Sequence, residues 1–185
     1  HLLSRRQRQM CIRDRLYTYL VEAYREAKMF DLDLSSFSRL VKGMALRGEW
    51  ETVFRFFARE LERQSAIREF IDGEAHIKGF LLAYLGLTQG YILFPEHESS
   101  KGYADFYMMP DLLHQPEIAY SYIVEVKYAK RDASEVEIAA LKKEAAEQLV
   151  RYAADEKVLR TKGGTKLELI TLVFKGWELV IAEKL

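Results

Sequence analysis

The chain has 185 residues, of which 49% are hydrophobic and 30% charged. That is the size of one domain with a small extension, and the composition excludes a disordered, collagen-like or low-complexity chain. The 28 basic and 28 acidic residues cancel, which removes the bulk electrostatic argument for a nucleic-acid partner. One cysteine, Cys11, excludes a disulfide framework, so we expect a reducing, cytoplasmic location. No apolar run approaches the ~20 residues of a membrane span, so we expect no membrane partner.

Residues 1–15 differ in composition from the rest of the chain. They carry five arginines against one aspartate, so the remainder is mildly acidic. The run from Arg5 to Arg15 looks like translated sequencing-adaptor sequence, and the chain does not begin with methionine. We therefore expect a fragment in which the segment 1–15 is not native. A basic arm for nucleic acid and a solvated helix start are the alternatives.

Residues 16–66 have a helical period and form a predicted N-terminal helical region, the end of an upstream domain or a linker. Ser35 or Ser36 can cap a helix that stops before Gly48. A second helix carries an apolar stripe with spacing i, i+3, i+4, i+7 and i+11, formed by Trp50, Val53, Phe54, Phe57 and Leu61. Such a stripe buries one face, and we expect it to pack a core.

Beyond residue 66 the pattern alternates between helix and strand. A helix is predicted over 74–87, and Ser134 with Glu137 forms a capping box that opens another helix extending to about residue 156. The predicted strands cover 91–94, 102–109, 119–128, 167–174 and 177–181. Turns or loops are predicted over 95–101, 110–117 and 162–165. The order helix, three strands, helix, two strands predicts an α/β or α+β sandwich.

One strand carries an acid and a lysine among apolar residues. Because side chains alternate along a strand, Glu125 and Lys127 share one face. A buried charge is costly unless it is paired or functional. Asp105 lies in the preceding strand, and Asp105 and Glu125 converge if the two strands pair as a hairpin. Two carboxylates and a backbone carbonyl are a hard-oxygen site suited to Mg²⁺ or Mn²⁺.

Lys127 has two readings at such a site. It can orient or deprotonate a metal-bound water and stabilise the charge that develops on a phosphate. Alternatively, the three charged residues form a cross-strand charge ladder at the edge of the sheet. The acid and lysine spacing on one strand does not by itself distinguish the two.

Three motifs together resemble the PD-(D/E)xK nuclease superfamily. They are G-Y-A-D at 102–105, Y-I-V-E-V-K at 122–127 and Q-L-V-R-Y at 148–152. The stretch from about residue 37 to 185 is similar to the nuclease-like domain that follows an AAA-type ATPase-like domain in many bacterial proteins. The resemblance implies a restriction-endonuclease-like core over 67–185 and a nucleic-acid substrate, DNA in preference to RNA. It also implies an ATPase-like partner domain N-terminal to this chain.

The resemblance also assigns roles to the charged strand residues. It implies that Asp105 and Glu125 are metal ligands, that the backbone carbonyl of Val126 is a third ligand, and that Lys127 is the catalytic lysine. Glu74 matches an extra acid that some members place on the preceding helix. An ordinary acid at a helix N-terminus is the alternative reading for Glu74.

The last motif lies on the helix that begins near Ser134. Gln148 and Tyr152 are spaced i and i+4, so they share one helix face, and the resemblance implies that they support the site and touch the substrate. A polar and aromatic pair that packs the helix on the sheet is the alternative.

The chain departs from the superfamily pattern at two positions. Ala104 replaces the proline of the superfamily name, and Tyr103 stands where near relatives often have an arginine. No phosphate-binding loop of the type G-x-x-x-x-G-K-[ST] is present in the sequence. We predict a metal-dependent nuclease domain that hydrolyses phosphodiester bonds. The alternative is a catalytically inactive interaction module of an ATPase-like protein.

Overall fold

A computed structural model describes residues 34–63, 71–87, 89–99 and 102–185. The predicted non-native segment 1–15 and the parts 16–33 and 64–66 of the predicted helical region lie outside them. The elements in chain order are α2 (Leu34–Arg47), α3 (Trp50–Arg63), α5 (Glu74–Gly86), β1 (Tyr91–Ser99), β2 (Gly102–Pro110), β3 (Tyr120–Ala129), α6 (Glu135–Ala153), α7 (Glu156–Thr161), β4 (Lys166–Lys175) and β5 (Glu178–Lys184). None of these helices has the length and apolar character needed to cross a bilayer. This order confirms the predicted mixed fold and is consistent with a restriction-endonuclease-like core.

The strands form one sheet in the order β1-β2-β3-β4-β5. β1, β2 and β3 are antiparallel neighbours, β3 pairs with β4 in parallel, and β4 pairs with β5 antiparallel. The parallel pair requires a long crossover, which α6 and α7 supply. The ladder between β2 and β3 spans Phe106 to Met108 on β2, so Asp105 is the first residue beyond it. This end of the ladder positions the site.

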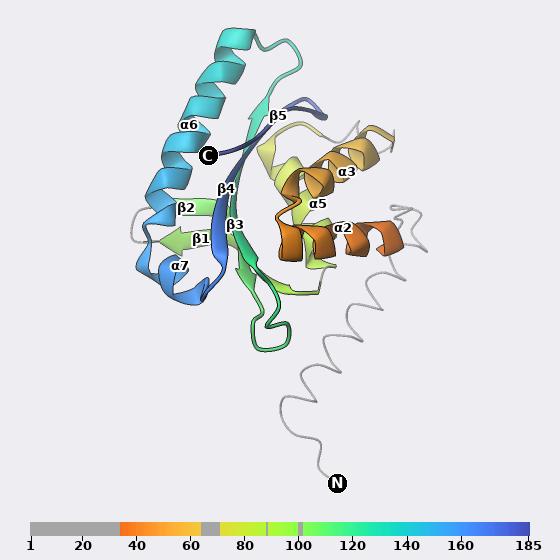
Figure 1. Ribbon diagram of the computed structural model, residues 1–185. Helices are drawn as coiled ribbons and strands as arrows, with labels where there is room; N and C mark the ends of the chain where they lie inside the picture. The colour runs from red at the N-terminus through yellow and green to blue at the C-terminus, as the bar shows by residue number, and fades with distance from the viewer. Residues whose placement is uncertain (1–33, 64–70, 88, 100–101) are drawn as a thin grey trace. The chain divides into compact units, whose positions relative to one another are not determined.

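Helices cover both faces of the sheet, with α6 and α7 on one side and α2, α3 and α5 on the other (Figure 1). On the α6 side a buried cluster is formed by Tyr107, Ile123, Leu149, Tyr152 and Val158. On the other side Phe57 packs edge to face against both Tyr84 and Phe174. The hydroxyl of Tyr122 there donates to the carbonyl of Met44 at 2.7 Å. Tyr122 and Glu125 therefore lie on opposite faces of the sheet, as alternation along β3 requires.

The predicted polar turn over 95–101 is wrong. β1 continues to Ser99 and β2 begins at Gly102, and Ser99 is paired with Gly102 at the end of the ladder. Two adjacent strands pair through backbone groups, which does not require apolar side chains. The polar composition of residues 95–101 therefore did not exclude a strand. The predicted loop over 110–117 starts one residue too early, because β2 includes Pro110 and the loop begins at Asp111.

Two predicted ends near the C-terminus also differ from the structure. The helix predicted to extend to about residue 156 is two helices, because the carboxylate of Asp155 accepts the amide hydrogens of Lys157 and Val158 and starts α7. The last strand begins at Glu178 and extends to Lys184, so Trp177 lies in the turn before it. The capping box of Ser134 and Glu137 at the start of α6 is confirmed.

Candidate active site

The two acids of the predicted site lie side by side where the pairing of β2 with β3 ends. Asp105 is 8% exposed and Glu125 is 2% exposed. The amide of Asp105 donates to Glu125 Oε2 at 3.4 Å, and the amide of Val126 donates to Asp105 Oδ2 at 2.8 Å. Each carboxylate is thus held by the backbone of the opposite strand. Hydrogen bonds of this kind fix the orientation of both acids.

Burial makes these two carboxylates unusually basic. Burial and the nearby negative charge of Asp105 together raise the pKa of Glu125 to about 7, against the opposing effect of Lys127. Burial also raises the pKa of Asp105, in spite of its bonds to Lys78 and to the amide of Val126. Two carboxylates that repel each other in a buried position favour the binding of a cation between or beside them.

Lys127 points to the same side of β3 as Glu125. Its Nζ lies 3.2 Å from Glu125 Oε1 and 3.0 Å from Oε1 of Glu144 on α6. Burial lowers the pKa of Lys127, but the bond to Glu144 and the charge of Glu125 outweigh it and hold that pKa above its usual value. The ammonium group therefore keeps its proton at neutral pH.

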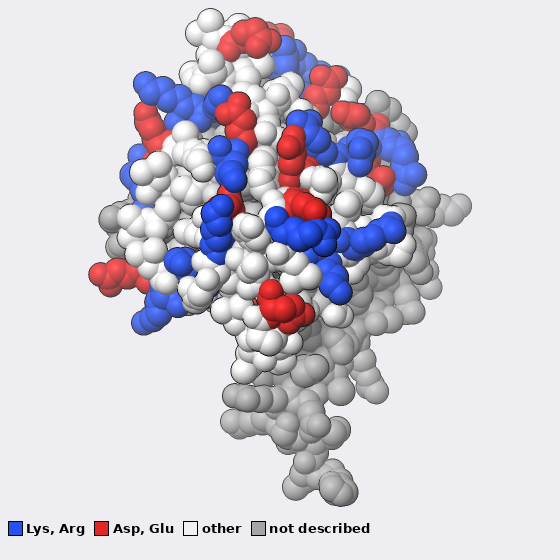
Figure 2. Space-filling model, viewed as in Figure 1, with Lys and Arg blue, Asp and Glu red and all other residues white. Residues whose placement is uncertain are grey.

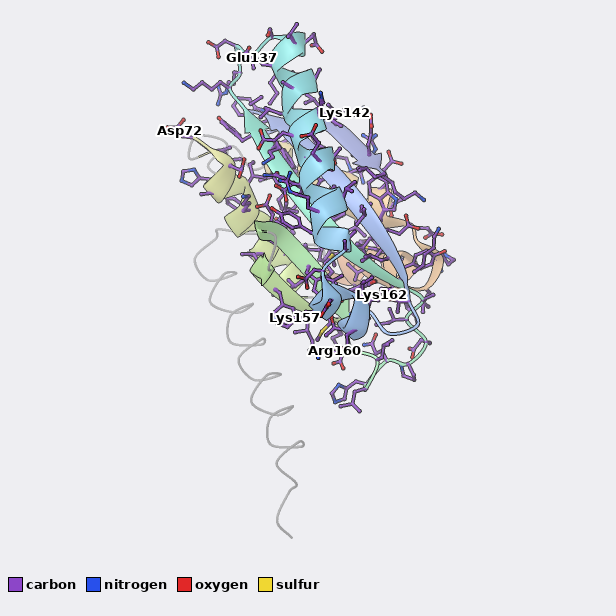
Figure 3. The ribbon with its side chains drawn as sticks, turned by 90° about the vertical axis from the view of Figure 1, so that its left-hand side faces the viewer. Asp72, Glu137, Lys142, Lys157, Arg160 and Lys162 are labelled. Atoms are coloured by element: carbon purple, nitrogen blue, oxygen red, sulfur yellow. The ribbon has the colours of Figure 1, made fainter. Side chains whose placement is uncertain are left out.

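One face of α6 covers the two strands that carry these charges. Glu144, Gln148 and Tyr152 follow one another at intervals of four residues, so they line one face of the helix. Glu144 contacts Lys127, and Tyr152 packs in the cluster that contains Ile123. Gln148 therefore lies between these two contacts, on the side of α6 that faces the sheet. Figure 3 looks onto α6 from its outer side, with the strands behind it.

Two buried polar atoms on the α6 side of the sheet have no hydrogen-bond partner in the described part of the chain. They are Oε1 of Gln148 and Oγ1 of Thr171. Thr171 is the register partner of Glu125 across the parallel β3–β4 pair, so both side chains lie on the same face of the sheet. Buried polar atoms normally bind a protein group or an ordered water. The position of Thr171 suits a ligand or water next to Glu125.

A second lysine reaches the site from α5. Lys78 Nζ forms an ion pair with Asp105 Oδ1 and lies 2.5 Å from Glu74 Oε1. Glu74 and Lys78 are spaced i and i+4 on α5. Burial lowers the pKa of Lys78, but its bonds to Asp105 and Glu74 outweigh this effect and hold it above its usual value. Glu74 thus approaches the site through Lys78.

The structure brings the predicted residues together, and it adds three that the sequence reading did not identify. Those three are Lys78, Glu144 and Thr171. A signal existed for the first two, because Lys78 is one helical turn after Glu74 and Glu144 is one turn before Gln148. Thr171 had none, since its position depends on the register of β4. The functional roles of all these residues stay predictions.

The donor set fits a small divalent cation. The Asp105 and Glu125 carboxylates and the Val126 carbonyl are hard oxygen donors, and Mg²⁺ takes few protein ligands and keeps several waters. Within the described ranges, no group of three or more His, Cys, Asp or Glu residues is arranged to hold a metal. The unpartnered atoms of Gln148 and Thr171 would be available as hydrogen-bond partners for water if a cation were bound there.

Basic residues near the site are mixed with acidic ones. Figure 2 shows Lys and Arg side chains interspersed with Asp and Glu on the face it presents. Arg131 stacks over the ring of Trp177 at 3.6 Å, and Lys142 pairs with Glu183. At the end of α6 far from Glu137, a further basic group comes from α7 and the loop after it, formed by Lys157, Arg160 and Lys162 (Figure 3). Because the charges on this face are mixed, attraction of a phosphate backbone would depend on individual basic residues and not on a continuous positive surface.

Comparison with known families identifies the class of this protein. The family model of the PD-(D/E)XK nuclease superfamily matches residues 72–184. The match covers more than half of the chain and includes every predicted site residue, so the chain belongs to this superfamily. A search of curated proteins found no match. Membership suggests a nuclease-like phosphodiesterase that binds nucleic acid, and members of the superfamily usually use divalent metals.

Proposed function

We propose that this chain hydrolyses phosphodiester bonds in DNA with Mg²⁺ or Mn²⁺ held by Asp105, Glu125 and the carbonyl of Val126. The observation that supports it best is the convergence of two buried carboxylates and one buried ammonium group at the end of the β2–β3 ladder. Charges in such a place are costly to a purely structural sheet. They suit a site that binds a cation and a phosphate.

Each side chain then has a distinct task. The divalent cation, when bound, supplies a polarised water and neutralises charge on the phosphate. Lys127 stays protonated between Glu125 and Glu144, so its task is to hold the nucleophile and stabilise the negative charge that develops on the phosphate. This position favours charge stabilisation over proton abstraction for Lys127. Glu144 orients the lysine.

Gln148 and Tyr152 form the wall of the proposed site on the α6 side. The unpartnered Oε1 of Gln148 is a buried hydrogen-bond acceptor on the side of α6 that faces the sheet. We assign it to a water or to a hydrogen-bond donor of the substrate. Tyr152 supports this wall by packing against Ile123 and Tyr107.

The domain arrangement stays part of the proposal. We propose that residues 67–185 are the nuclease-like domain and that an AAA-type ATPase-like domain is its partner in the natural protein. The resemblance of the chain to ATPase-associated nuclease-like domains supports this partner.

Cleavage assays on a Lys127→Ala variant test the proposed activity. The full chain is incubated with linear double-stranded DNA, single-stranded DNA or RNA, each with Mg²⁺, Mn²⁺ or EDTA. We expect divalent-dependent cleavage that falls by about 10²-fold or more in Lys127→Ala. Lys142→Ala is the matched control, because Lys142 on α6 forms an exposed ion pair with Glu183 on β5. Equal cleavage by wild type and by folded Lys127→Ala would sink the proposal.

An inactive interaction module is the second candidate. One observation favours it, since the charges of both proposed ligands are already balanced by lysines, Asp105 by Lys78 and Glu125 by Lys127. The sequence also has Tyr103 where near relatives often have an arginine, so that basic group is missing here. Absence of cleavage and of Mn²⁺ binding in the folded wild type would favour this module.

A further inference from the structure

We infer that Lys78 is an internal counter-ion of Asp105 that competes with the divalent cation and must move toward Glu74 when the metal binds. This inference rests on the proposed function, because it takes Asp105 as a metal ligand. It assigns Lys78 a positioning role that acts through Asp105. It also assigns Glu74 the role of receiving the displaced lysine, in place of ligating the metal.

The inference starts from how the two oxygens of Asp105 are used. Oδ2 accepts the amide of Val126 at 2.8 Å, and that amide belongs to the buried strand β3. Oδ1 carries the ion pair with Lys78. The backbone contact is fixed by the sheet, whereas a lysine side chain has several rotatable bonds. Oδ1 is therefore the oxygen that can exchange its partner.

A cation bound at Oδ1 would lie close to the Lys78 ammonium. Two positive charges that share one carboxylate oxygen repel each other, and the repulsion is stronger in a partly buried position than in water. Asp105 has only 9% of its side chain exposed, and Lys78 has 24%. Binding of the metal is therefore coupled to movement of Lys78.

Glu74 gives Lys78 a place to go. It lies one helical turn before Lys78 on α5, is already paired with it, and has 36% of its side chain exposed, more than Asp105. A lysine that leaves Asp105 thus keeps an ion pair and gains water. Lys127 has no such freedom, because it is 7% exposed on the central strand and held between Glu125 and Glu144. The exchange is therefore assigned to Lys78.

Isothermal titration of MnCl₂ into the full chain tests this exchange. Lys78→Met removes the competing charge and keeps an unbranched side chain, so we expect Mn²⁺ to bind about tenfold more tightly, within the usual range of coupling between two sites. Lys78→Arg keeps the charge and should bind Mn²⁺ about as weakly as wild type. Lys142→Met is the matched control, and its affinity should not change. Unchanged or weaker binding by folded Lys78→Met would overturn the inference.

A second measurement uses the wild-type chain and does not depend on the folding of a variant. Acylation of lysine amines is followed by mass spectrometry with and without saturating Mn²⁺. We expect the labelling rate of Lys78 to rise several-fold with Mn²⁺ while that of Lys142 stays constant. A Lys78 rate that does not rise under saturation contradicts a displaced lysine.

Asp105→Asn separates this inference from the proposed function. If wild type binds Mn²⁺, Asp105→Asn abolishes the binding and Lys78→Met leaves it unchanged, the metal site stands and the inference fails. If Mn²⁺ binds Lys78→Met but not wild type, Lys78 blocks the site and the inference is supported. If neither binds Mn²⁺, both the proposed metal site and the inference fall.

Discussion

The Glu125 carboxylate accepts the amide hydrogen of Asp105 at an N···O distance of 3.4 Å, at the step where β2 and β3 stop pairing. The carboxylate of Asp105 in turn accepts the amide of Val126, next to Glu125. Backbone amides therefore hold the two acids next to each other, in addition to their ion pairs with Lys78 and Lys127. This arrangement forces their negative charges into one buried place.

The first prediction concerns the pH dependence of stability. The pKa of Glu125 is 4.5 in an unfolded chain and about 7 in the folded protein. Between these values the folded state binds more protons than the unfolded state, so the free energy of unfolding falls as pH rises through this window and stays lower above it. Glu125→Gln removes this titration. In EDTA at pH 8 we expect the variant to exceed wild type by up to ~3 kcal/mol.

Urea denaturation at several pH values between 4.5 and 8 measures this effect. Glu135→Gln, at an exposed position in the first turn of α6, serves as the control and should keep the wild-type pH profile. The same slope in Glu125→Gln and in wild type would contradict the raised pKa of Glu125.

The second prediction separates stability from activity at Gln148. Its buried Oε1 has no hydrogen-bond partner among the described residues, which costs about 1–3 kcal/mol for a polar group of this kind. We expect Gln148→Met to unfold at the same or a higher urea concentration than wild type and to lose cleavage activity. Gln89→Met, at an exposed position, should change neither. A destabilised Gln148→Met with full activity would assign Gln148 a packing role.

The third prediction concerns the turn between β4 and β5. Gly176 has φ +61°, and an added Cβ would lie 2.9 Å from Cγ of Arg131. Left-handed backbone costs an L-residue roughly 1–2 kcal/mol, so we expect Gly176→Ala to lower the free energy of unfolding by at least that amount.

Gly79→Ala is the matched control for the turn. Gly79 lies inside α5 with open space where a Cβ would be added. Alanine favours a helix by about 1 kcal/mol over glycine, so this variant should be as stable as wild type or more stable. Urea denaturation compares the two variants, and equal effects would refute the strain at Gly176.

The fourth prediction concerns the start of α6, which carries the wall of the site. Ser134 Oγ accepts the amide of Glu137, and the Glu137 carboxylate accepts the amide of Ser134 at 2.7 Å. Ser134→Ala removes the cap, and we expect a loss of ~1 kcal/mol in the free energy of unfolding. Ser134→Asp keeps an acceptor at this position and should restore most of it. Equal losses in both variants would show that the cap does not stabilise α6.

Local sequence patterns are enough to predict several features of the candidate site without any tertiary contact. The period of two along β3 put Glu125 and Lys127 on one face, and the spacing of four on α6 put Gln148 and Tyr152 together. The capping box likewise marks the start of α6, because its hydrogen bonds join residues that are close in the sequence. These features depend on short stretches of chain, so the sequence is enough to predict them.

The tertiary structure alone decided which charges meet. Lys78 reaches Asp105 from α5, and Glu144 reaches Lys127 from α6. Thr171 lies beside Glu125 through the parallel register of β4. Such contacts depend on strand register and helix packing, which are set by the burial of the whole core and not by local periodicity. The same reason explains the polar strand ends that were predicted as a turn. The balance of charge at the site is thus a property of the assembled fold.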